Sequence, residues 1–578
     1  MTEAVEWLPD GTPRSPRFGD IYRSRTGGLG HSRHVFLHGC GLPAAWAGQT
    51  QWRILETGFG LGLNFLAVWR AWKDDPERPR MLHFASIEAW PVSAADLVRS
   101  AEADPELVPL AQELAAQWHG LLPGAHRLTF EGGHVLLTLF VGDVRGGLRQ
   151  QPFYADSIFL DGFEPHRNPV MWDVQVFKAV ARHSRRGTRV AIWTTAGDVR
   201  RDLAQCGFVV DKADGLAPMR HHLQGEFAPA WEPKGQRPFD AVAAGHCAVI
   251  GSGLAGASVA ASLARRGWLV TVLDAAGTPA GGASGLPVGL LAPNFSPDDN
   301  LLSRLSRAGV RLTLEQARAL LCEGTDWQAD GVLEQRLGNK AVRHEQAGWI
   351  KPGALVEAWL RQPGITWLGN AKVAQLVEHE GRWRLIDANG EALAIADLVV
   401  VCAAHASAAL LEGRLALQAV RGQVSWGSQP PDLTQPSCPV NGNGHFIPHV
   451  PQGAERAWYC GSTFDRGDTD LSPRDADHHF NLERLRALLP EVAARLAHAF
   501  TDGSVKAWTG IRCASNDRRP LLGEVTPGLW VSTAMGSRGL TFAVLCAELL
   551  AARLHGEPLP LERRLALALD VRRRGAMT

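Results

Sequence analysis

Two glycine-rich turns carry the strongest chemical signals in the sequence. In the first, ETGFGLGLNFLAVW, the glycines Gly58, Gly60 and Gly62 alternate between a short apolar run and a helix-like pattern. Glycines at such a turn allow close backbone approach to a ligand, and the following helix points its electropositive N-terminus at the same place. The turn lacks the lysine of a phosphate-binding P-loop. It therefore predicts a ligand cradle of another kind.

Three acidic residues follow apolar runs downstream of this turn. Glu88 ends HFASIE, Asp143 follows VLLTLFVG, and Asp161 follows SIFL. In an open α/β sheet the ligand lies at the carboxyl ends of the strands. Glu88 could accept hydrogen bonds from ribose hydroxyls there, and Asp143 from an adenine amino group. Each carboxylate taken alone could instead be a helix cap or a surface group.

The second turn lies in VIGSGLAGASVAASLARRGWLVTVLD, a complete strand–turn–helix–strand pattern over residues 249–274. Gly251 suits the tight turn, Gly253 admits a pyrophosphate, and Gly256 lets the helix pack closely on the strand. Asp274 ends the second strand, where it can accept hydrogen bonds from ribose hydroxyls. The pattern predicts dinucleotide binding. The alternative is a purely structural glycine turn.

The sequence shows no metal-binding pattern. Its nine cysteines are scattered without a CxxC pair, which also argues against a disulfide framework. The histidine pairs at 221–222 and 478–479 have no carboxylate or further histidine at ligand spacing. We therefore expect no metal site.

Composition describes an ordinary globular protein. The chain has 578 residues, of which 45% are hydrophobic and 20% charged, and Lys+Arg and Asp+Glu balance at 59 each. This balance excludes a uniformly basic nucleic-acid coat, although a local basic patch is compatible with it. No apolar run approaches the ~20 residues of a membrane helix, and the first residues do not resemble a signal peptide. We expect a cytoplasmic monomer without a membrane segment.

Two α/β domains must position these residues. Apolar runs alternate with helical patterns from about residue 50 to 210, which predicts a doubly wound parallel sheet. A stretch rich in Pro, Gly and Ala then precedes the second glycine turn. We therefore predict a first domain over 1–235, a linker over 236–246 and a second domain over 247–578.

Five segments of the second half resemble the D-amino-acid-oxidase-like FAD family. They are GGASGLPVGLLAP, GWIKPGALVEAW, RGQVSW, WTGIRCASNDRRPLLGEV and LWVSTAMGSRGLTFAVLCAELLAA. The resemblance implies an FAD-binding Rossmann domain with a β-rich, substrate-binding insertion. It also implies further FAD-binding residues, which are Ala283, Ser284, Val373, Gly536, Ser537 and Gly539. Of these, Val373 would lie near the adenine, and the helix opening at Gly539 would face the pyrimidine end of the flavin.

Enzymes of that family remove hydride from a carbon next to an amine nitrogen, and water hydrolyses the resulting imine. A carboxylate on such a substrate usually requires an arginine fork. Arg512 and Arg538 are the candidates for this catalytic role. Either could instead be a structural ion-pair partner.

The first half resembles the class I S-adenosylmethionine methyltransferases. The resemblance rests on the order of three features, which are an acidic residue for the ribose, an acidic residue for the adenine, and a loop that contains a carboxylate and aromatic residues. The resemblance makes Glu56 and the three turn glycines cofactor-binding residues, together with Glu88 and Asp143. Asp161 would be catalytic. At an ordinary carboxyl pKa of ~4 it is a poor base for an alkylammonium of pKa ~10, since six units correspond to ~8 kcal/mol. We expect Asp161 to orient an amine while water removes the proton.

The whole chain resembles the bifunctional tRNA 5-methylaminomethyl-2-thiouridine biosynthesis family, through segments such as GDIYRSRTGGLGHSRHVFLHG and IFLDGFEPHRNPVMW. The resemblance implies FAD, S-adenosylmethionine and tRNA as ligands. The flavin domain would release the carboxymethyl group of a wobble-uridine side chain as glyoxylate, and the other domain would methylate the amine. The sequence departs from the family at His31–Ser32, where an acid and threonine are usual.

Two other readings remain open from the sequence. One is an amine oxidase of the glycine or sarcosine type fused to a methyltransferase for small amines. The other is a flavin-bearing binding module without turnover. Activity on free glycine or sarcosine without RNA would favour the first, and a flavin that modified tRNA does not bleach would favour the second.

Overall fold

The computed structural model describes residues 2–23, 28–217, 219–231, 241–336, 340–573 and 575. The chain forms two compact units, which we describe separately. The first comprises Met1–Val242 and Ala552–Arg564, and the second comprises Ala243–Ala551 and Leu565–Thr578. The predicted linker lies partly outside the described residues. Residues 552–564, which we predicted in the second domain, belong to the first unit.

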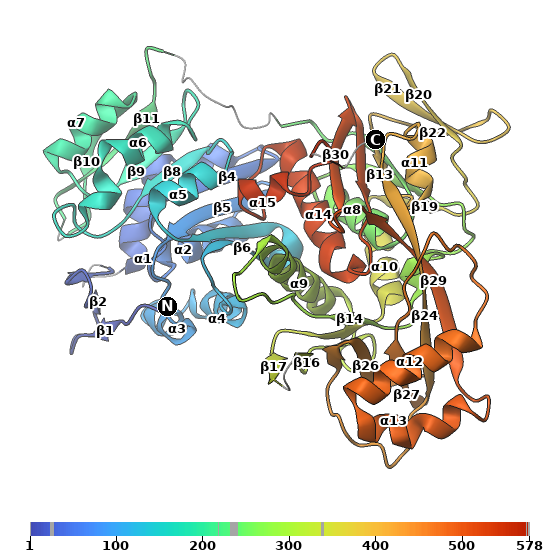
Figure 1. Ribbon diagram of the computed structural model, residues 1–578. Helices are drawn as coiled ribbons and strands as arrows, with labels where there is room; N and C mark the ends of the chain where they lie inside the picture. Colours follow the sequence, from blue (N-terminus) through green and yellow to red (C-terminus); the bar gives the residue numbers. More distant parts are fainter. Residues whose placement is uncertain are drawn as a thin grey trace. The chain divides into compact units, whose positions relative to one another are not determined.

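An eight-stranded sheet of order β10-β11-β9-β8-β4-β5-β7-β6 organises the first unit (Figure 1). Its strands are β4 (Gln51–Glu56), β5 (Met81–Glu88), β6 (Gly124–Phe130), β7 (Val135–Val141), β8 (Ser157–Leu160), β9 (Arg189–Ile192), β10 (Phe208–Asp214) and β11 (His221–Phe227). The five central strands pair in parallel, and the pairs that β6, β10 and β11 form are antiparallel. Short strands β1 (Glu6–Trp7), β2 (Pro13–Ser15) and β3 (Asp20–Ile21) form a separate small sheet.

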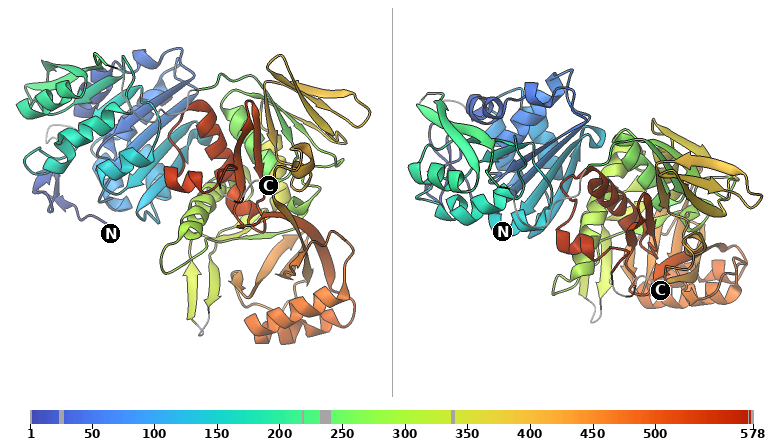
Figure 2. Two further views of the ribbon diagram at one scale, coloured as in Figure 1. Left: turned by 45° about the horizontal axis from the view of Figure 1, so that its top comes forward. Right: turned by 90° about the horizontal axis from the view of Figure 1, so that it is seen from above.

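Helices cover both faces of the large sheet (Figures 1 and 2). They are α1 (Gly28–His31), α2 (Leu63–Asp74), α3 (Ala94–Ala101), α4 (Val108–Gln117), α5 (Val144–Gln150), α6 (Val174–Ala181) and α7 (Gly197–Gln205). Successive strand residues point to opposite faces, so Ile54 and Phe84 belong to one buried cluster while Leu55 and Ala85 belong to the other. The predicted doubly wound α/β sheet is therefore confirmed.

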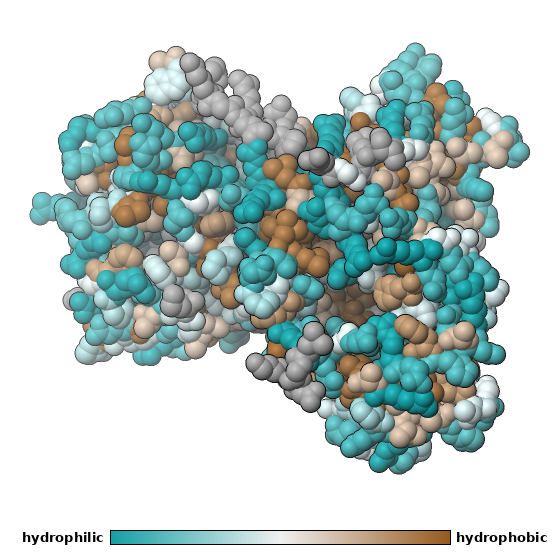
Figure 3. Space-filling view, in the orientation of Figure 1, coloured by the Kyte–Doolittle hydropathy of each residue, from teal (hydrophilic) through white to brown (hydrophobic). Residues whose placement is uncertain are grey.

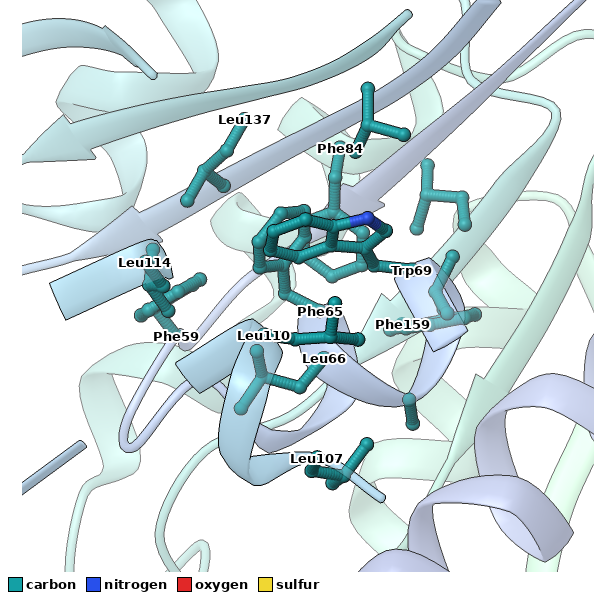
Figure 4. Packing of buried hydrophobic residues seen from close by; sticks show 14 of the residues in the cluster. Phe59, Phe65, Leu66, Trp69, Phe84, Leu107, Leu110, Leu114, Leu137 and Phe159 are labelled. Carbon is teal, nitrogen blue, oxygen red and sulfur yellow. The ribbon is translucent and has the colours of Figure 1, made fainter. Parts of the chain in front are cut away.

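Buried aromatic residues fix the first glycine turn. Phe59, between two of its glycines, is 3% exposed and belongs to the cluster in which Phe65 packs on Trp69 and Phe84 (Figure 4). The ring of Phe59 also stacks on Trp118 at 5.1 Å. Anchored in this way, the turn between β4 and α2 holds its backbone at the edge of the sheet.

The segment Ala552–Arg564 is hydrogen-bonded into the first unit. Three of its backbone carbonyls accept hydrogen bonds from the buried side chains of Arg53, Arg127 and Gln151. The Gln151 side chain also accepts a hydrogen bond from the segment, because its Oε1 accepts the N–H of Leu559 at 2.9 Å. Polar groups buried without partners are costly. Because the segment supplies acceptors to three buried side chains, it is an integral part of the fold of the first unit.

We expect Gln151→Ala to lower the free energy of unfolding of the first unit by about 2 kcal/mol, because it removes two buried hydrogen bonds and leaves their partners unsatisfied. Urea denaturation of the full chain measures the effect. Gln112→Ala, on the exposed face of α4, is the matched control and is expected to change little. Equal stability of the two variants would contradict the structural role of the segment.

The second unit contains a six-stranded sheet of order β19-β13-β12-β23-β31-β30. Its strands are β12 (His246–Ile250), β13 (Leu269–Leu273), β19 (Ile365–Leu368), β23 (Leu398–Val401), β30 (Leu521–Thr526) and β31 (Leu529–Thr533). All neighbours pair in parallel except β30, which is antiparallel to β31. Two helices follow strands of this sheet, α8 (Leu254–Arg265) after β12 and α14 (Gly539–His555) after β31.

A second large sheet, of order β17-β16-β25-β26-β27-β24-β28 with β29 on β24, is the predicted β-rich insertion. Its strands are β16 (Val332–Arg336), β17 (Lys340–His344), β24 (Leu417–Ser428), β25 (Val440–Gly442), β26 (Gly444–Gln452), β27 (Glu455–Gly461), β28 (Asp465–Arg466) and β29 (Lys506–Ser515). Smaller sheets comprise β14 (Gly289–Leu291), β15 (Trp327–Gln328) and β18 (Gly348–Ile350), and β20 (Gln375–His379), β21 (Arg382–Ile386) and β22 (Ala392–Ala396). The remaining helices of eight or more residues are α9 (Leu301–Leu320), α10 (Pro352–Leu360) and α12 (Asp475–Leu488).

Among the residues that the structure describes, no helix is both long and apolar enough to cross a membrane. Hydrophilic side chains cover much of the face shown in Figure 3.

Candidate active sites

A cavity of about 610 Å³ opens in the first unit where the strands of its sheet end. Its lining includes Gly58 and Gly60 from the first turn, and the three acidic residues Glu88, Asp143 and Asp161. The structure thus brings together residues that are far apart in the sequence. This is the edge of an open α/β sheet at which ligands bind.

Backbone N–H groups orient Glu88 in this cavity. Gly60 and Trp90 each donate a backbone hydrogen bond to its carboxylate, both at 2.9 Å. Burial raises the pKa of Glu88, and these hydrogen bonds partly oppose the rise. Gly60 and Gly62 have φ values of +53° and +73°, which glycine adopts without strain. Gly62 occupies the N-cap position of α2 but supplies no side-chain cap.

Asn64 links two carboxylates beside the cavity. Its Nδ2 donates to Asp161 at 2.8 Å and to Glu56 at 2.9 Å, while the hydroxyl of Ser32 donates to its Oδ1 at 2.6 Å. Glu56 is 1% exposed and does not line the cavity; Ser86 donates to its other oxygen. Burial and then Asp161 raise the pKa of Glu56 to about 8. Asn64 therefore connects the buried Glu56 to Asp161 in the cavity lining.

Sequence reasoning missed Asn64, and it named Ser32 only as a departure from the resembled family. The available signal was a single polar residue in the first turn of an otherwise apolar helix pattern, LNFLAVW. Ser32 retains a hydroxyl at the position where the resembled family has threonine.

Asp161 has a higher pKa than the ordinary value that the sequence analysis assumed. Burial raises its pKa to about 6, although hydrogen bonds from Gly162 and Asn64 act in the opposite direction. The Gly162 N–H lies 2.8 Å from Oδ1. A virtual Cβ on Gly58 would lie 3.0 Å from the Asp161 carbonyl oxygen, so the glycine turn also packs against this residue.

Asp143 serves as a helix cap and also lines the cavity. Its Oδ1 accepts the N–H of Gly146 at 2.9 Å at the N-terminus of α5. The helix-cap alternative named above is therefore seen, together with a position from which this carboxylate can contact a ligand.

The second glycine turn is built around close backbone contacts. Gly251 has φ +104°, and a Cβ there would lie 2.7 Å from the carbonyl oxygen of Cys402. A Cβ on Gly256 would overlap the Gly251 carbonyl oxygen. Asp274 accepts hydrogen bonds from the N–H of Ser252 and of Ala276, at 2.6 and 2.8 Å, so its carboxylate is held beside the turn.

Further predicted residues gather at the start of α8. Ser284, in the short helix Ala283–Gly285, accepts the N–H of Leu254 at 2.9 Å and would lie 2.9 Å from a Cβ on Gly253. A Cβ on Gly539 would lie 3.0 Å from Leu254. The N-termini of α8 and α14 therefore meet, which suits a ligand with more than one electron-rich group.

The remaining predicted FAD-binding residues lie in two other segments of the second unit. Gly536 (φ +58°) and the exposed Ser537 form the turn before α14. Val373 is 8% exposed and follows Ala371, whose N–H donates to the Asp274 carbonyl oxygen.

Arg512 lies on β29 across a glycine of the neighbouring strand. A Cβ on Gly422 would overlap its guanidinium, so only glycine leaves room for it. Arg512 donates to the Ser462 hydroxyl at 2.7 Å and to the Thr463 carbonyl at 3.1 Å, and lies 4.4 Å over the Phe464 ring. Burial lowers the pKa of Arg512 to about 10, and the charge of Asp465 partly opposes this shift.

Two further polar groups accompany this arginine in the second unit. Burial, reinforced by Arg512 and Arg484, lowers the pKa of His445 to about 4, so this imidazole is neutral at pH 7. The sequence analysis did not single out His445. Arg538 lies in the turn before α14, and among the described residues its side chain has no hydrogen-bond or ion-pair partner. Burial lowers its pKa.

No group of three or more His, Cys, Asp or Glu in the described part of the chain is arranged to hold a metal ion.

Comparisons with known proteins match both units. Residues 105–228 match the model of an S-adenosyl-L-methionine-dependent methyltransferase family, and residues 246–337 and 333–553 match that of an FAD dependent oxidoreductase family. The chain is 56% identical to the "tRNA 5-methylaminomethyl-2-thiouridine biosynthesis bifunctional protein MnmC" of Polaromonas sp. (strain JS666), with 98% of each chain covered. The protein of the same name from Acidovorax sp. (strain JS42) is 51% identical, with 99% of each chain covered. The one from Cupriavidus necator is 39% identical, over 97% of this chain and 96% of the relative.

Among solved structures, glycine oxidase from Geobacillus kaustophilus matches with 19% identity and a TM-score of 0.47, over 57% of this chain and 98% of that one.

Proposed function

The chain belongs to the family of bifunctional tRNA 5-methylaminomethyl-2-thiouridine biosynthesis proteins, and from this premise we propose how its two units divide the modification of a tRNA wobble uridine. The second unit is an FAD-dependent oxidoreductase and the first an S-adenosylmethionine-dependent methyltransferase. The product of the oxidoreductase is the substrate of the methyltransferase, which gives the fusion its chemical logic.

The first step removes a carboxymethyl group from the 5-carboxymethylaminomethyl side chain. FAD, when bound, accepts two electrons. The substrate's CH₂–NH bond is oxidised to an imine, and water then hydrolyses it to a primary amine and glyoxylate. Arg512 pairs with the substrate carboxylate, and Arg538 is the second candidate for that contact. The residues proposed to hold FAD are Gly251, Gly253, Gly256, Asp274, Ala283, Ser284, Val373, Gly536, Ser537 and Gly539.

The second step transfers a methyl group to the amine just released. Gly58, Gly60, Gly62, Glu88 and Asp143 hold S-adenosylmethionine, and Glu56 supports this site through Asn64. Only a neutral amine has a lone pair for attack. Because burial raises the pKa of Asp161 to about 6, it lies some four units below an alkylammonium, or ~5 kcal/mol. Asp161 therefore orients the amine and stabilises the positive charge growing on nitrogen, while water takes the proton.

The pH dependence of methylation follows from these two groups. We expect kcat/KM to rise about tenfold per pH unit between pH 6 and 10, as the amine loses its proton. Below about pH 6, protonation of Asp161 adds a second factor, and the slope steepens to about a hundredfold per unit. Initial rates of methylation on aminomethyl-uridine tRNA measure this profile.

The sulfonium of bound S-adenosylmethionine favours the charged form of Asp161, so the break should move to lower pH when the donor is saturating. The oxidation step of the same protein serves as control and should lack the break. A profile with a single slope from pH 5 to 9 at a donor concentration well below saturation would contradict the role of Asp161.

The observation that carries the proposal is the presence of two separate glycine-turn sites in one chain, each at the carboxyl end of its own sheet. The test incubates tRNA carrying the carboxymethylaminomethyl group with the protein and analyses the nucleosides by mass spectrometry. Without S-adenosylmethionine the nucleoside should lose the carboxymethyl group, and with it gain one methyl group. Turnover of free glycine or sarcosine in place of tRNA would contradict the proposal.

We also propose that the protein acts as a cytoplasmic monomer. Its substrate tRNA functions in the cytoplasm, and each proposed site is formed by residues of one unit of a single chain. Size-exclusion chromatography with light scattering tests the monomer.

A further inference from the structure

The charges that line the cavity of the first unit are mostly negative. Its described acidic residues are Glu3, Asp20, Glu88, Asp143, Asp161 and Glu164. Two described lining residues can carry positive charge, Arg23 and His31. Burial lowers the pKa of His31 to about 4, so it is neutral at pH 7. Arg23 is therefore the one permanent cation among the lining residues that the structure describes.

Arg23 lacks the partners that neighbouring arginines have. Arg14, Arg17 and Arg33 pair with glutamates at 3.2, 2.9 and 2.7 Å. The Nε of Arg23, in contrast, is buried without a hydrogen-bond partner among the described residues. Asp104 feels its charge, which acts to lower that carboxyl's pKa, but no ion pair joins the two. Arg23 is partly buried and lines the cavity, and a buried guanidinium N–H without an acceptor is satisfied when an anion binds beside it.

The position of Arg23 indicates which part of a ligand it faces. A Cβ on Gly28 would lie 2.8 Å from Cδ of Arg23 and 2.5 Å from Cδ2 of Leu63, the first residue of α2. The stem of Arg23 and the side chain of Leu63 therefore both pack against Gly28. Gly62 provides no side-chain cap at the N-terminus of α2. A guanidinium and a helix N-terminus without a side-chain cap both favour an anion, and Arg23 and Leu63 line the same cavity.

S-adenosylmethionine carries one anionic group, the carboxylate of its methionyl part, beside a positive sulfonium and a positive ammonium. In a cavity lined by six acidic residues, this carboxylate requires a cation. We propose that Arg23 binds the methionyl carboxylate of S-adenosylmethionine and thereby selects donors that carry it. This inference rests on the proposed methyl-donor site in the first unit.

Calorimetry on the full chain tests the proposal without relying on activity. We expect Arg23→Met to weaken binding of S-adenosylhomocysteine about 10- to 100-fold, the range for losing hydrogen bonds to a charged group. Binding of methylthioadenosine, which has no carboxylate, should be unchanged. Arg23→Lys, which keeps the charge, should recover part of the lost affinity.

Arg33→Met is the matched control, because Arg33 is a partly exposed arginine outside the cavity lining and is paired with Glu106. It should leave both affinities unchanged. Equal weakening of both ligands by Arg23→Met would show a collapsed cavity and overturn the proposal. Unchanged S-adenosylhomocysteine affinity with a higher KM for tRNA would overturn it in favour of an RNA contact. Failure of the unaltered protein to bind either ligand would overturn the methyl-donor site itself.

Discussion

Asp161→Ala is expected to reduce methylation of the aminomethyl group about 10²- to 10³-fold while leaving release of the carboxymethyl group at its original rate. The carboxylate is placed where positive charge develops on the amine nitrogen, and losing one such preorganised group typically has an effect of this size. Asn64 and the Gly162 N–H already fix its two oxygens, so little reorganisation is required during the reaction. Nucleoside mass spectrometry with and without S-adenosylmethionine measures both steps on one protein.

Two further variants sharpen this test. Asp161→Asn retains the size of the side chain but not its charge, and should lose nearly as much methylation. Asp211→Ala removes an exposed carboxylate from β10 and should change neither step. Equal loss of both activities in Asp161→Ala would refute the assignment, because it would indicate general unfolding rather than loss of one site.

Gly422→Ala is expected to reduce oxidation of the carboxymethyl group by about 10²-fold or more, with methylation unchanged. The added methyl group would occupy the space of the Arg512 guanidinium, which must then leave its hydrogen bonds to Ser462 and Thr463. A substrate carboxylate bound by a displaced arginine loses charge-assisted hydrogen bonds, which are among the strongest in proteins. The rate of flavin reduction by modified tRNA, measured without oxygen, reports this step directly.

A matched glycine distinguishes this effect from ordinary loss of stability. Gly353 in α10 has open space around its virtual Cβ, so Gly353→Ala should leave oxidation intact. If Arg512 is the group that Gly422→Ala disturbs, adding Arg512→Met should cause little further loss, since both changes remove the same contact. Normal oxidation by Gly422→Ala with a normal flavin spectrum would contradict the role assigned to Arg512.

Local sequence patterns predicted those parts of the fold and sites that depend on local geometry. Glycine spacing located both turns, because a turn that needs positive φ or close backbone contact admits almost only glycine. Acidic residues at strand ends were predictable for a similar reason, since parallel strands bring their carboxyl ends to one edge. The cavity lining of Glu88, Asp143 and Asp161 agrees with that reasoning.

Features that depend on distant contacts were not predictable in this way. Asn64 donates to Glu56, eight residues before it, and to Asp161, 97 residues after it, and the local sequence does not reveal the second partner. The raised pKa of Asp161 arises from burial by elements far along the chain. The buried Nε of Arg23 without an acceptor is likewise a property of three-dimensional packing, because a sequence shows an arginine but not which acceptors lie near it.

The hydrogen-bonded place of Ala552–Arg564 in the first unit has a consequence during biosynthesis. A nascent polypeptide leaves the ribosome in order, so all of Ala243–Ala551 is translated before this segment exists. At 5–20 residues per second that delay is on the order of tens of seconds. Until then Arg53 and Arg127 have only water in place of these carbonyls, and the methyltransferase reaches its mature form only at the end of translation. A premature stop codon shortly before residue 552 would therefore weaken the enzyme encoded first in the message.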